Sequence, residues 1–193
     1  RDSSTSRGLG DVYKRQLHTL IFDDPECRPF YYENGKSFKD YHKEGEIFWH
    51  KYVTYTEGMS DYWDYSFFNV SVIRYADVLL LYAECLNDKG ETTEAINIIN
   101  KVRARVNVPA LPLTMGKAEV LKHLQDKERP CELALEGSRW YDLVRWGIVE
   151  ETLKAHNKPF VENYVDTKHQ LFPIPHSEFL LNPDWEQNPN YSK

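Results

Sequence analysis

The stretch Ile73-Arg74-Tyr75-Ala76-Asp77-Val78-Leu79-Leu80-Leu81-Tyr82-Ala83-Glu84 carries the clearest helical pattern in the chain. Apolar side chains recur in and around it at the three- and four-residue spacing of one helix face: Val72, Tyr75, Ala76, Leu79, Leu80, Ala83 and Leu86. Gly90 follows and predicts the end of the helix, since glycine is the common residue just past a helix C-terminus.

A second helix is predicted directly after this one. Thr92 or Thr93 can cap its start, and the apolar pattern returns at Ala95, Ile96, Ile99, Val102 and Val106. Two helices of about 15 residues joined by a short turn form an αα-hairpin, and its small residues resemble those of a tetratricopeptide unit. Only one such unit is recognisable, so the sequence does not predict a repeat array.

More helices are predicted up to residue 147. A third runs over 117–128, with Val120, Leu121 and Leu124 on one face, and Pro130 predicts a kink or a new start. A fourth pattern covers Cys131 to Trp146, with Gly147 behind it. The helical core is therefore expected over 72–147, and the prolines of 159–193 predict an irregular tail.

The N-terminal third looks different. Residues 1–16 are polar, rich in Ser and Gly, and resemble a non-native leader, so we take 17–193 as the domain. Aromatic and β-branched residues over 47–55 predict a strand.

Composition narrows the class of protein. The chain has 193 residues, of which 41% are hydrophobic and 28% charged, which is typical of a folded globular domain. A net charge of −6 leaves no basic excess for nucleic acid, so we expect no nucleic-acid partner. Cys27, Cys85 and Cys131 show no metal-ligand spacing, and their disulfide state stays open. We expect no metal and no cofactor.

Three glutamates recur every four residues, at Glu128, Glu132 and Glu136, which would place them on one helix face. They have two interpretations. A glycoside hydrolase needs two carboxyl groups about 5–9 Å apart on either side of a sugar bond, whereas carboxylates on one helix face project the same way. Arg139 and Arg145 follow Glu136 and Asp142 by three residues, and a paired carboxylate is a poor general acid. We favour structural ion pairs.

Four motifs together resemble the SusD/RagB family. They are the Ile73–Glu84 stretch, the helix from Ala95-Ile96 to Asn100-Lys101-Val102-Arg103-Ala104-Arg105, the segment Glu132-Leu133-Ala134-Leu135-Glu136-Gly137-Ser138-Arg139-Trp140-Tyr141-Asp142-Leu143-Val144-Arg145-Trp146-Gly147, and the ending Leu171-Phe172-Pro173-Ile174-Pro175 with Asn182-Pro183 and Gln187-Asn188-Pro189-Asn190-Tyr191. They occur in the family's order across 72–191. Pro130-Cys131 departs from the family's basic pair, and Asn190 replaces its glycine.

The resemblance implies the C-terminal part of a mainly α protein, with tetratricopeptide-like helical hairpins in an α/α superhelix, irregular loops and little β structure. It implies a lipoprotein at the cell surface, in the outer membrane, that binds an oligosaccharide or another nutrient without catalysis and passes it to a SusC-like TonB-dependent transporter. It also implies that a structural ion-pair network holds the helices together: Arg74, Glu84, Glu132, Glu136, Arg139, Asp142 and Arg145.

The family's ligand residues vary, so candidates come from composition. The chain holds 13 Tyr and 5 Trp, and such rings stack on sugars. Tyr62, Trp63, Asp64 and Tyr65, next to Asp61, form the densest loop-like aromatic segment; the alternative is that they pack in the core or on a partner. Two other functions stay open: a tetratricopeptide-like protein-interaction scaffold, and a glycosidase using Glu132 or Glu136.

Overall fold

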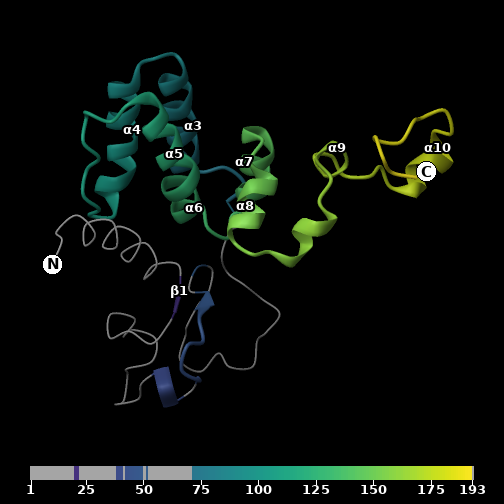
Figure 1. The fold of residues 1–193 in the computed structure, drawn as a ribbon, viewed down its shortest axis with the longest axis horizontal. Coiled ribbons are helices and arrows are strands. Elements are labelled where there is room, and N and C mark those ends of the chain that lie inside the picture. The colour runs from purple at the N-terminus through teal and green to yellow at the C-terminus, as the bar shows by residue number, and fades with distance from the viewer. Residues whose placement is uncertain (1–19, 22–37, 41, 50, 52–70, 193) are drawn as a thin grey trace. The chain divides into compact units, whose positions relative to one another are not determined.

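The computed structural model describes residues 20–21, 38–40, 42–49, 51 and 71–192 (Figure 1). The chain divides into two compact units, Arg1–Gly137 and Ser138–Lys193, and each is described by itself. The predicted ligand segment 61–65 lies outside the described residues.

The first unit is centred on the predicted hairpin. Helices α3 (Tyr75–Asp88) and α4 (Thr92–Arg105) lie side by side as an antiparallel pair (Figure 1). Gly90, with φ of 90°, forms the turn between them, a conformation that favours glycine. Leu80 and Ala83 of α3 are fully buried against Ala95, Ile96 and Ile99 of α4. The apolar periodicity that predicted the hairpin therefore marks most of its core, whereas Val72 and Tyr75, from the same predicted face, are exposed.

The third predicted helix packs on this core, but it is not one regular α-helix. It consists of α5 (Lys117–His123) and the π-helical turn η4 (Leu124–Glu128), which continues into α6 (Arg129–Glu132). Val120 and Leu124 are fully buried in the hairpin core. The π-turn comes just before Pro130, which has no N–H for the α-helical ladder and whose ring crowds the carbonyl one turn earlier.

The predicted continuous helix from Cys131 to Trp146 is wrong. Helix α6 ends at Glu132 and α7 (Ser138–Trp146) begins only six residues later. Leu135 and Gly137 lie between them with φ of 64° and 76°, in the left-handed region that a right-handed helix cannot contain. Glu136 therefore does not share a helix face with Glu128 and Glu132.

The second unit contains short elements. Helices α7 and α8 (Val149–Ala155) pack through Leu143, Val149 and Leu153, with Trp140 and Tyr164 at the edge. They are followed by η5 (Pro159–Asn163), α9 (Asp166–His169) and α10 (His176–Leu181). Helix α8 was not predicted from the sequence.

Strand structure is sparse among the described residues. Strands β1 (Leu20–Ile21) and β2 (Phe48–Trp49) pair antiparallel, with Leu20 opposite Trp49. Of the predicted strand over 47–55, only Phe48–Trp49 is seen as strand; His50 and 52–55 lie outside the described residues. The 3-10 turn η3 (Phe38–Asp40) buries Phe38 fully. The prediction of a mainly helical fold with little β structure is confirmed.

None of the helices seen in the described ranges combines the length and the apolar character that a bilayer crossing requires.

Candidate functional site

The turn between α6 and α7, residues 132–137, is held by a guanidinium that is distant in sequence. Arg74 lies just before α3, and its Nη1 donates to Glu132 Oε1 at 2.7 Å. Its Nε donates to Glu136 Oε2 at 2.5 Å, and its Nη2 donates to the backbone oxygen of Glu132 at 2.5 Å. One side chain thus binds both glutamates, and the planar fork of arginine suits this geometry.

Two further cations reach the same turn. Lys51, just after β2, donates to the Glu136 carboxylate and, at 3.0 Å, to the backbone oxygen of Ala134. Arg105, at the end of α4, donates from Nη2 to Glu132 Oε1 at 2.7 Å. We call Lys51, Arg74, Arg105, Glu132 and Glu136 the clamp. It joins the start of α3, the end of α4 and the second residue after β2 to one turn.

The clamp carboxylates are buried, and the pKa of Glu136 is shifted. The exposed fraction of the side chain is 4% for Glu132 and 7% for Glu136. Burial alone would raise the pKa of Glu136, but the hydrogen bonds from Arg74 and Lys51 outweigh it, so its pKa lies below the ordinary value. The pKa of Arg74 is raised: burial opposes the shift, and bonds to Glu136 and Glu132 outweigh burial. A carboxylate held ionised in this way is unsuited to donate a proton to a leaving group.

A second buried ionic group is centred on Glu128, the last residue of the π-turn. Glu128, 1% exposed, accepts from Arg103 Nη1 at 2.8 Å and contacts His123 Nε2 at 2.9 Å. Arg103 also donates from Nε to the backbone oxygen of Pro109 at 2.8 Å. Arg129 forms an ion pair with Asp77 at 2.8 Å. These contacts tie α5, η4 and α6 to the hairpin.

The other residues predicted for the ion-pair network lie on two helices, α3 and α7. Glu84 is partly buried on α3, and Arg139 is partly buried on α7. Asp142 and Arg145 pair within α7, with Nε 3.0 Å and Nη2 2.9 Å from Asp142 Oδ1. The structure thus brings Arg74, Glu132 and Glu136 together, and Asp142 with Arg145.

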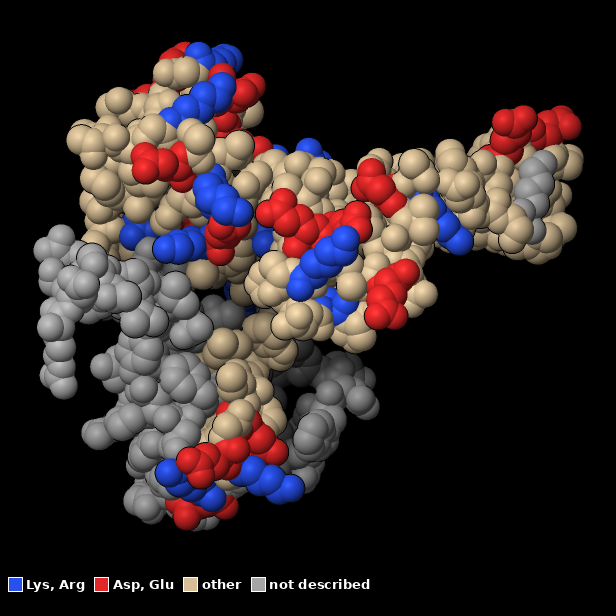
Figure 2. Space-filling view, in the orientation of Figure 1, with Lys and Arg blue, Asp and Glu red and all other residues tan. Residues whose placement is uncertain are grey.

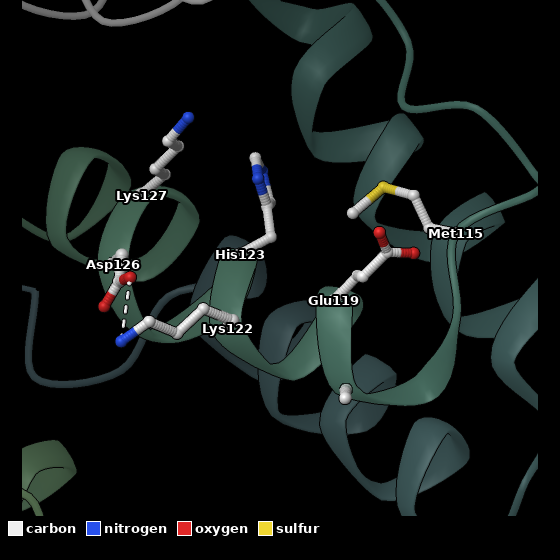
Figure 3. A pocket seen from close by; sticks show the side chains of 7 residues that line it. Met115, Glu119, Lys122, His123, Asp126 and Lys127 are labelled. Atoms are coloured by element: carbon white, nitrogen blue, oxygen red, sulfur yellow. Dashed lines mark ion pairs between the residues drawn. The ribbon is translucent and has the colours of Figure 1, made fainter.

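A shallow hollow lies on the outer side of α5 and η4. Its volume is about 420 Å³, and it is lined by Met115, Ala118, Glu119, Lys122, His123, Asp126 and Lys127 (Figure 3). Lys122 and Asp126 form an ion pair of 3.1 Å at its rim. The hollow is open to solvent along one helix face and is lined by no Phe, Tyr or Trp, so we assign it no ligand. None of the residues predicted from the sequence for ligand binding or for the ion-pair network lines this hollow.

The remaining charges do not form a patch of one sign on the face that is drawn in Figure 2, where basic and acidic side chains are interspersed over the described elements. Among the described residues, no group of three or more His, Cys, Asp or Glu is gathered as a metal ion would need.

Comparison with known proteins identifies the family. The model of the SusD family matches residues 30–191, which is most of the chain. The chain belongs to the SusD family. The resemblance seen in the four sequence motifs is therefore confirmed.

SusD-family relatives are known by sequence and by structure. SusD-like protein P38 of Formosa agariphila is 35% identical over 132 residues, 64% of this chain and 25% of the relative. SusD-like protein P25 of the same organism is 36% identical over 125 residues, 60% of this chain and 23% of the relative. The chain spans about a quarter of the length of these relatives.

Two crystal structures show the same SusD fold. A SusD superfamily protein from Bacteroides vulgatus ATCC 8482 superposes with a TM-score of 0.75 and 30% identity, covering 92% of this chain and 39% of that chain. A SusD homolog from Bacteroides thetaiotaomicron VPI-5482 gives a TM-score of 0.64 and 26% identity, covering 97% of this chain and 43% of that chain. The helices described above are thus part of a larger SusD-family architecture in those proteins.

Proposed function

We propose that this SusD-family chain is part of a receptor that binds an oligosaccharide or another nutrient at the bacterial surface without cleaving it. The observation that carries the proposal is the family match over residues 30–191. The ion pairs of the two clamp glutamates also support it. Glu132 and Glu136, the acids considered for a glycosidase, are each bound by two cations in the clamp.

The binding mode we propose is stacking of aromatic rings on sugar rings, with carboxylates accepting from sugar hydroxyls. Tyr62, Trp63 and Tyr65, flanked by Asp61 and Asp64, remain the candidate residues. Stacking needs no general acid and no metal, which fits a receptor that releases its nutrient unchanged.

The experiment is electrophoresis of the chain through gels that contain individual polysaccharides. We expect retention on at least one polysaccharide, and we expect Trp63→Ala and Tyr65→Ala to abolish it. Trp185→Ala is the matched control, because Trp185 is a half-exposed tryptophan far along the chain. If retention is unchanged in Trp63→Ala and Tyr65→Ala, these residues are not the site; if the unaltered chain is retained on no polysaccharide, glycan binding by this part of the protein is contradicted.

Absence of catalysis has its own test. The chain is incubated with the polysaccharide that retains it, and reducing ends are measured. We expect none above background. Hydrolysis that disappears in Glu136→Gln while circular dichroism stays unchanged would establish the glycosidase alternative instead.

We further propose that the complete protein sits in the outer membrane, facing outward, and associates with a SusC-like TonB-dependent transporter. Purification from membranes through an affinity tag on this protein should bring down one large outer-membrane protein in equal amount. The helical hairpin of α3 and α4 also suits the alternative scaffold function, which would be favoured if the tag instead recovered a soluble protein and no transporter.

A further inference from the structure

The sequence on either side of the candidate segment 61–65 carries one sign of charge. Between Lys51 and Arg74 it holds no Lys, Arg or His. The same stretch holds three carboxylates: Glu57, Asp61 and Asp64. A cation that is to bind an anionic group of the nutrient must therefore come from outside this stretch, and the two nearest in sequence are Lys51 and Arg74.

Both of these flanking cations are engaged in the clamp. Lys51 donates to the carboxylate of Glu136 and, at 3.0 Å, to the backbone oxygen of Ala134. Arg74 donates to the carboxylates of Glu132 and Glu136. The exposed fractions of the two basic side chains are 22% and 25%. An anionic nutrient would have to take these cations from buried carboxylates, and leaving a buried charge without its partner is strongly unfavourable.

Other cations of the described residues are neutralised within the chain as well. Three arginines pair with acids at 2.8–2.9 Å: Arg103 with Glu128, Arg129 with Asp77 and Arg145 with Asp142. Three lysines do the same at 2.6–3.1 Å: Lys117 with Asp88, Lys122 with Asp126 and Lys154 with Glu150. The whole chain carries a net charge of −6. Much of its positive charge is thus bound to its own carboxylates.

We propose that the nutrient bound by this chain is an uncharged oligosaccharide, and that polysaccharides carrying sulfate or carboxylate groups are excluded. The inference rests on the proposed function and names its substrate class. Asp61 and Asp64 can accept hydrogen bonds from the hydroxyls of a neutral sugar, and aromatic rings stack on it. An anionic sugar would instead bring a like charge beside these carboxylates while Lys51 and Arg74 are held in the clamp.

The first test compares three forms of one polysaccharide in affinity gels: unmodified, sulfated and hydroxyethylated. The starting material is the neutral polysaccharide that retains the chain most strongly. Hydroxyethyl groups add bulk without charge, so this form is the matched control for size. We expect retention on the unmodified and hydroxyethylated forms, and retention weaker by about tenfold or more on the sulfated form at low salt.

Added salt separates the effect of charge from that of shape. Raising the NaCl concentration from about 20 mM to about 500 mM should recover retention on the sulfated form, because salt screens repulsion between exposed charges. It should leave retention on the unmodified form nearly constant. Retention on the sulfated form that equals that on the unmodified form at low salt overturns the proposal, and so does a loss that salt does not relieve.

The second test removes the negative charges of the candidate segment. In the double variant Asp61→Asn, Asp64→Asn, the ratio of retention on the unmodified form to retention on the sulfated form should fall by about threefold or more at low salt. Asp184→Asn, an exposed acid in the second unit, is the matched control and should leave this ratio unchanged. An unchanged ratio in the double variant would contradict the proposal, because these carboxylates would then not set the preference for charge.

Failure of this proposal can be told from failure of the proposed function. Retention on anionic polysaccharides alone would overturn the neutral substrate class and leave nutrient binding in place. Retention on no polysaccharide, neutral or anionic, would contradict glycan binding by this chain, and the neutral substrate class with it.

Discussion

The guanidinium of Arg74 binds the carboxylates of both Glu132 and Glu136, residues 58 and 62 positions further along the chain. Because Arg74 lies at the start of α3 and Glu136 lies between the left-handed residues Leu135 and Gly137, this contact fixes where the chain leaves the helical core of the first unit.

Removing Arg74 should destabilise the first unit strongly. Arg74→Ala leaves two buried carboxylates without their shared partner, and breaking buried ion pairs costs about 3–5 kcal/mol. Arg105→Ala removes a cation from the same Glu132 carboxylate, yet Arg105 is 59% exposed, so its loss should cost about 1 kcal/mol or less. Urea denaturation gives both values, and equal losses would show that burial does not set the strength of the clamp.

Stability should depend on the ionisation of Glu136. Its pKa in the folded protein lies below the ordinary 4.5. The folded state therefore binds the proton less readily than the unfolded chain. The stability that Glu136 contributes is fully present above pH 4.5 and is lost as the pH falls through the folded value.

The measurement is the urea midpoint between pH 3 and pH 7 for the unaltered chain and for Glu136→Gln. The difference between the two should be largest near neutral pH and should shrink toward pH 3. Glu151→Gln, an exposed control on α8, should follow the unaltered chain throughout. A difference that does not change with pH would mean that Glu136 acts through packing and not through its charge.

Substitutions at the two left-handed residues of this turn, Leu135 and Gly137, should change the stability in different directions. Gly137→Ala should destabilise by about 1 kcal/mol, because an L side chain at positive φ is strained even where space is open. Leu135→Gly should be neutral or stabilising, since Leu135 is 44% exposed and already adopts φ of 64°. Thermal unfolding monitored by circular dichroism checks both. A marked loss in Leu135→Gly would show that the leucine side chain makes a contact worth more than its strain.

The two faces of α3 should differ in the 193-residue chain. Leu80→Ala should cost about 2–5 kcal/mol, because Leu80 is fully buried. Leu81→Ala removes the same atoms from a position that is 38% exposed and should cost clearly less. Urea denaturation of the two variants measures their free energies of unfolding. Equal decreases would contradict the packing described for the hairpin.

In the second unit, the side chain of Gln187 should hold the backbone at Ile174 to the backbone at Asn188. Its Oε1 accepts from the backbone N–H of Ile174 at 2.8 Å and of Asn188 at 2.9 Å, and its Nε2 donates to the backbone oxygen of Ile174 at 2.9 Å. Gln187→Ala should speed hydrogen exchange at the amides of Ile174 and Asn188 by on the order of tenfold. Gln187→Glu keeps the acceptor and loses the donor, so its effect should be smaller. Unchanged exchange in Gln187→Ala would mean that these amides are protected by something else.

Local periodicity was sufficient to predict the hairpin. The apolar spacing placed α3 and α4 within a few residues, and Gly90 marked the turn where φ is 90°. The same method failed over Cys131–Trp146, because the repeat of acidic and apolar residues continues through a turn that long-range contacts hold out of helical geometry. Gly137 was the one local sign of a break.

The partners in the ionic groups were harder to predict, because the pairs are distant in sequence. Lys51 and Arg105 were not predicted as part of the clamp, and the contacts of Arg103 and His123 with Glu128 were not predicted either. A usable signal was present: Arg103 falls on the apolar stripe of Ile96, Ile99 and Val102, and Glu128 falls one turn beyond Val120 and Leu124. A charge on a buried stripe predicts a buried partner of opposite sign. The aromatic segment 61–65 stays a prediction.

The π-turn over Leu124–Glu128 holds one residue more than a regular helix would place there. Because the turn absorbs the extra residue, deleting one residue from it would restore regular α-helical winding with little rotation of α6 relative to α5. Arg129 would still face Asp77, and Glu132 would still face Arg74. Loss of one codon at an exposed position of this turn should therefore be tolerated, whereas loss of one codon within the regular turns of α5 would rotate the downstream acidic segment by about 100° away from its cations.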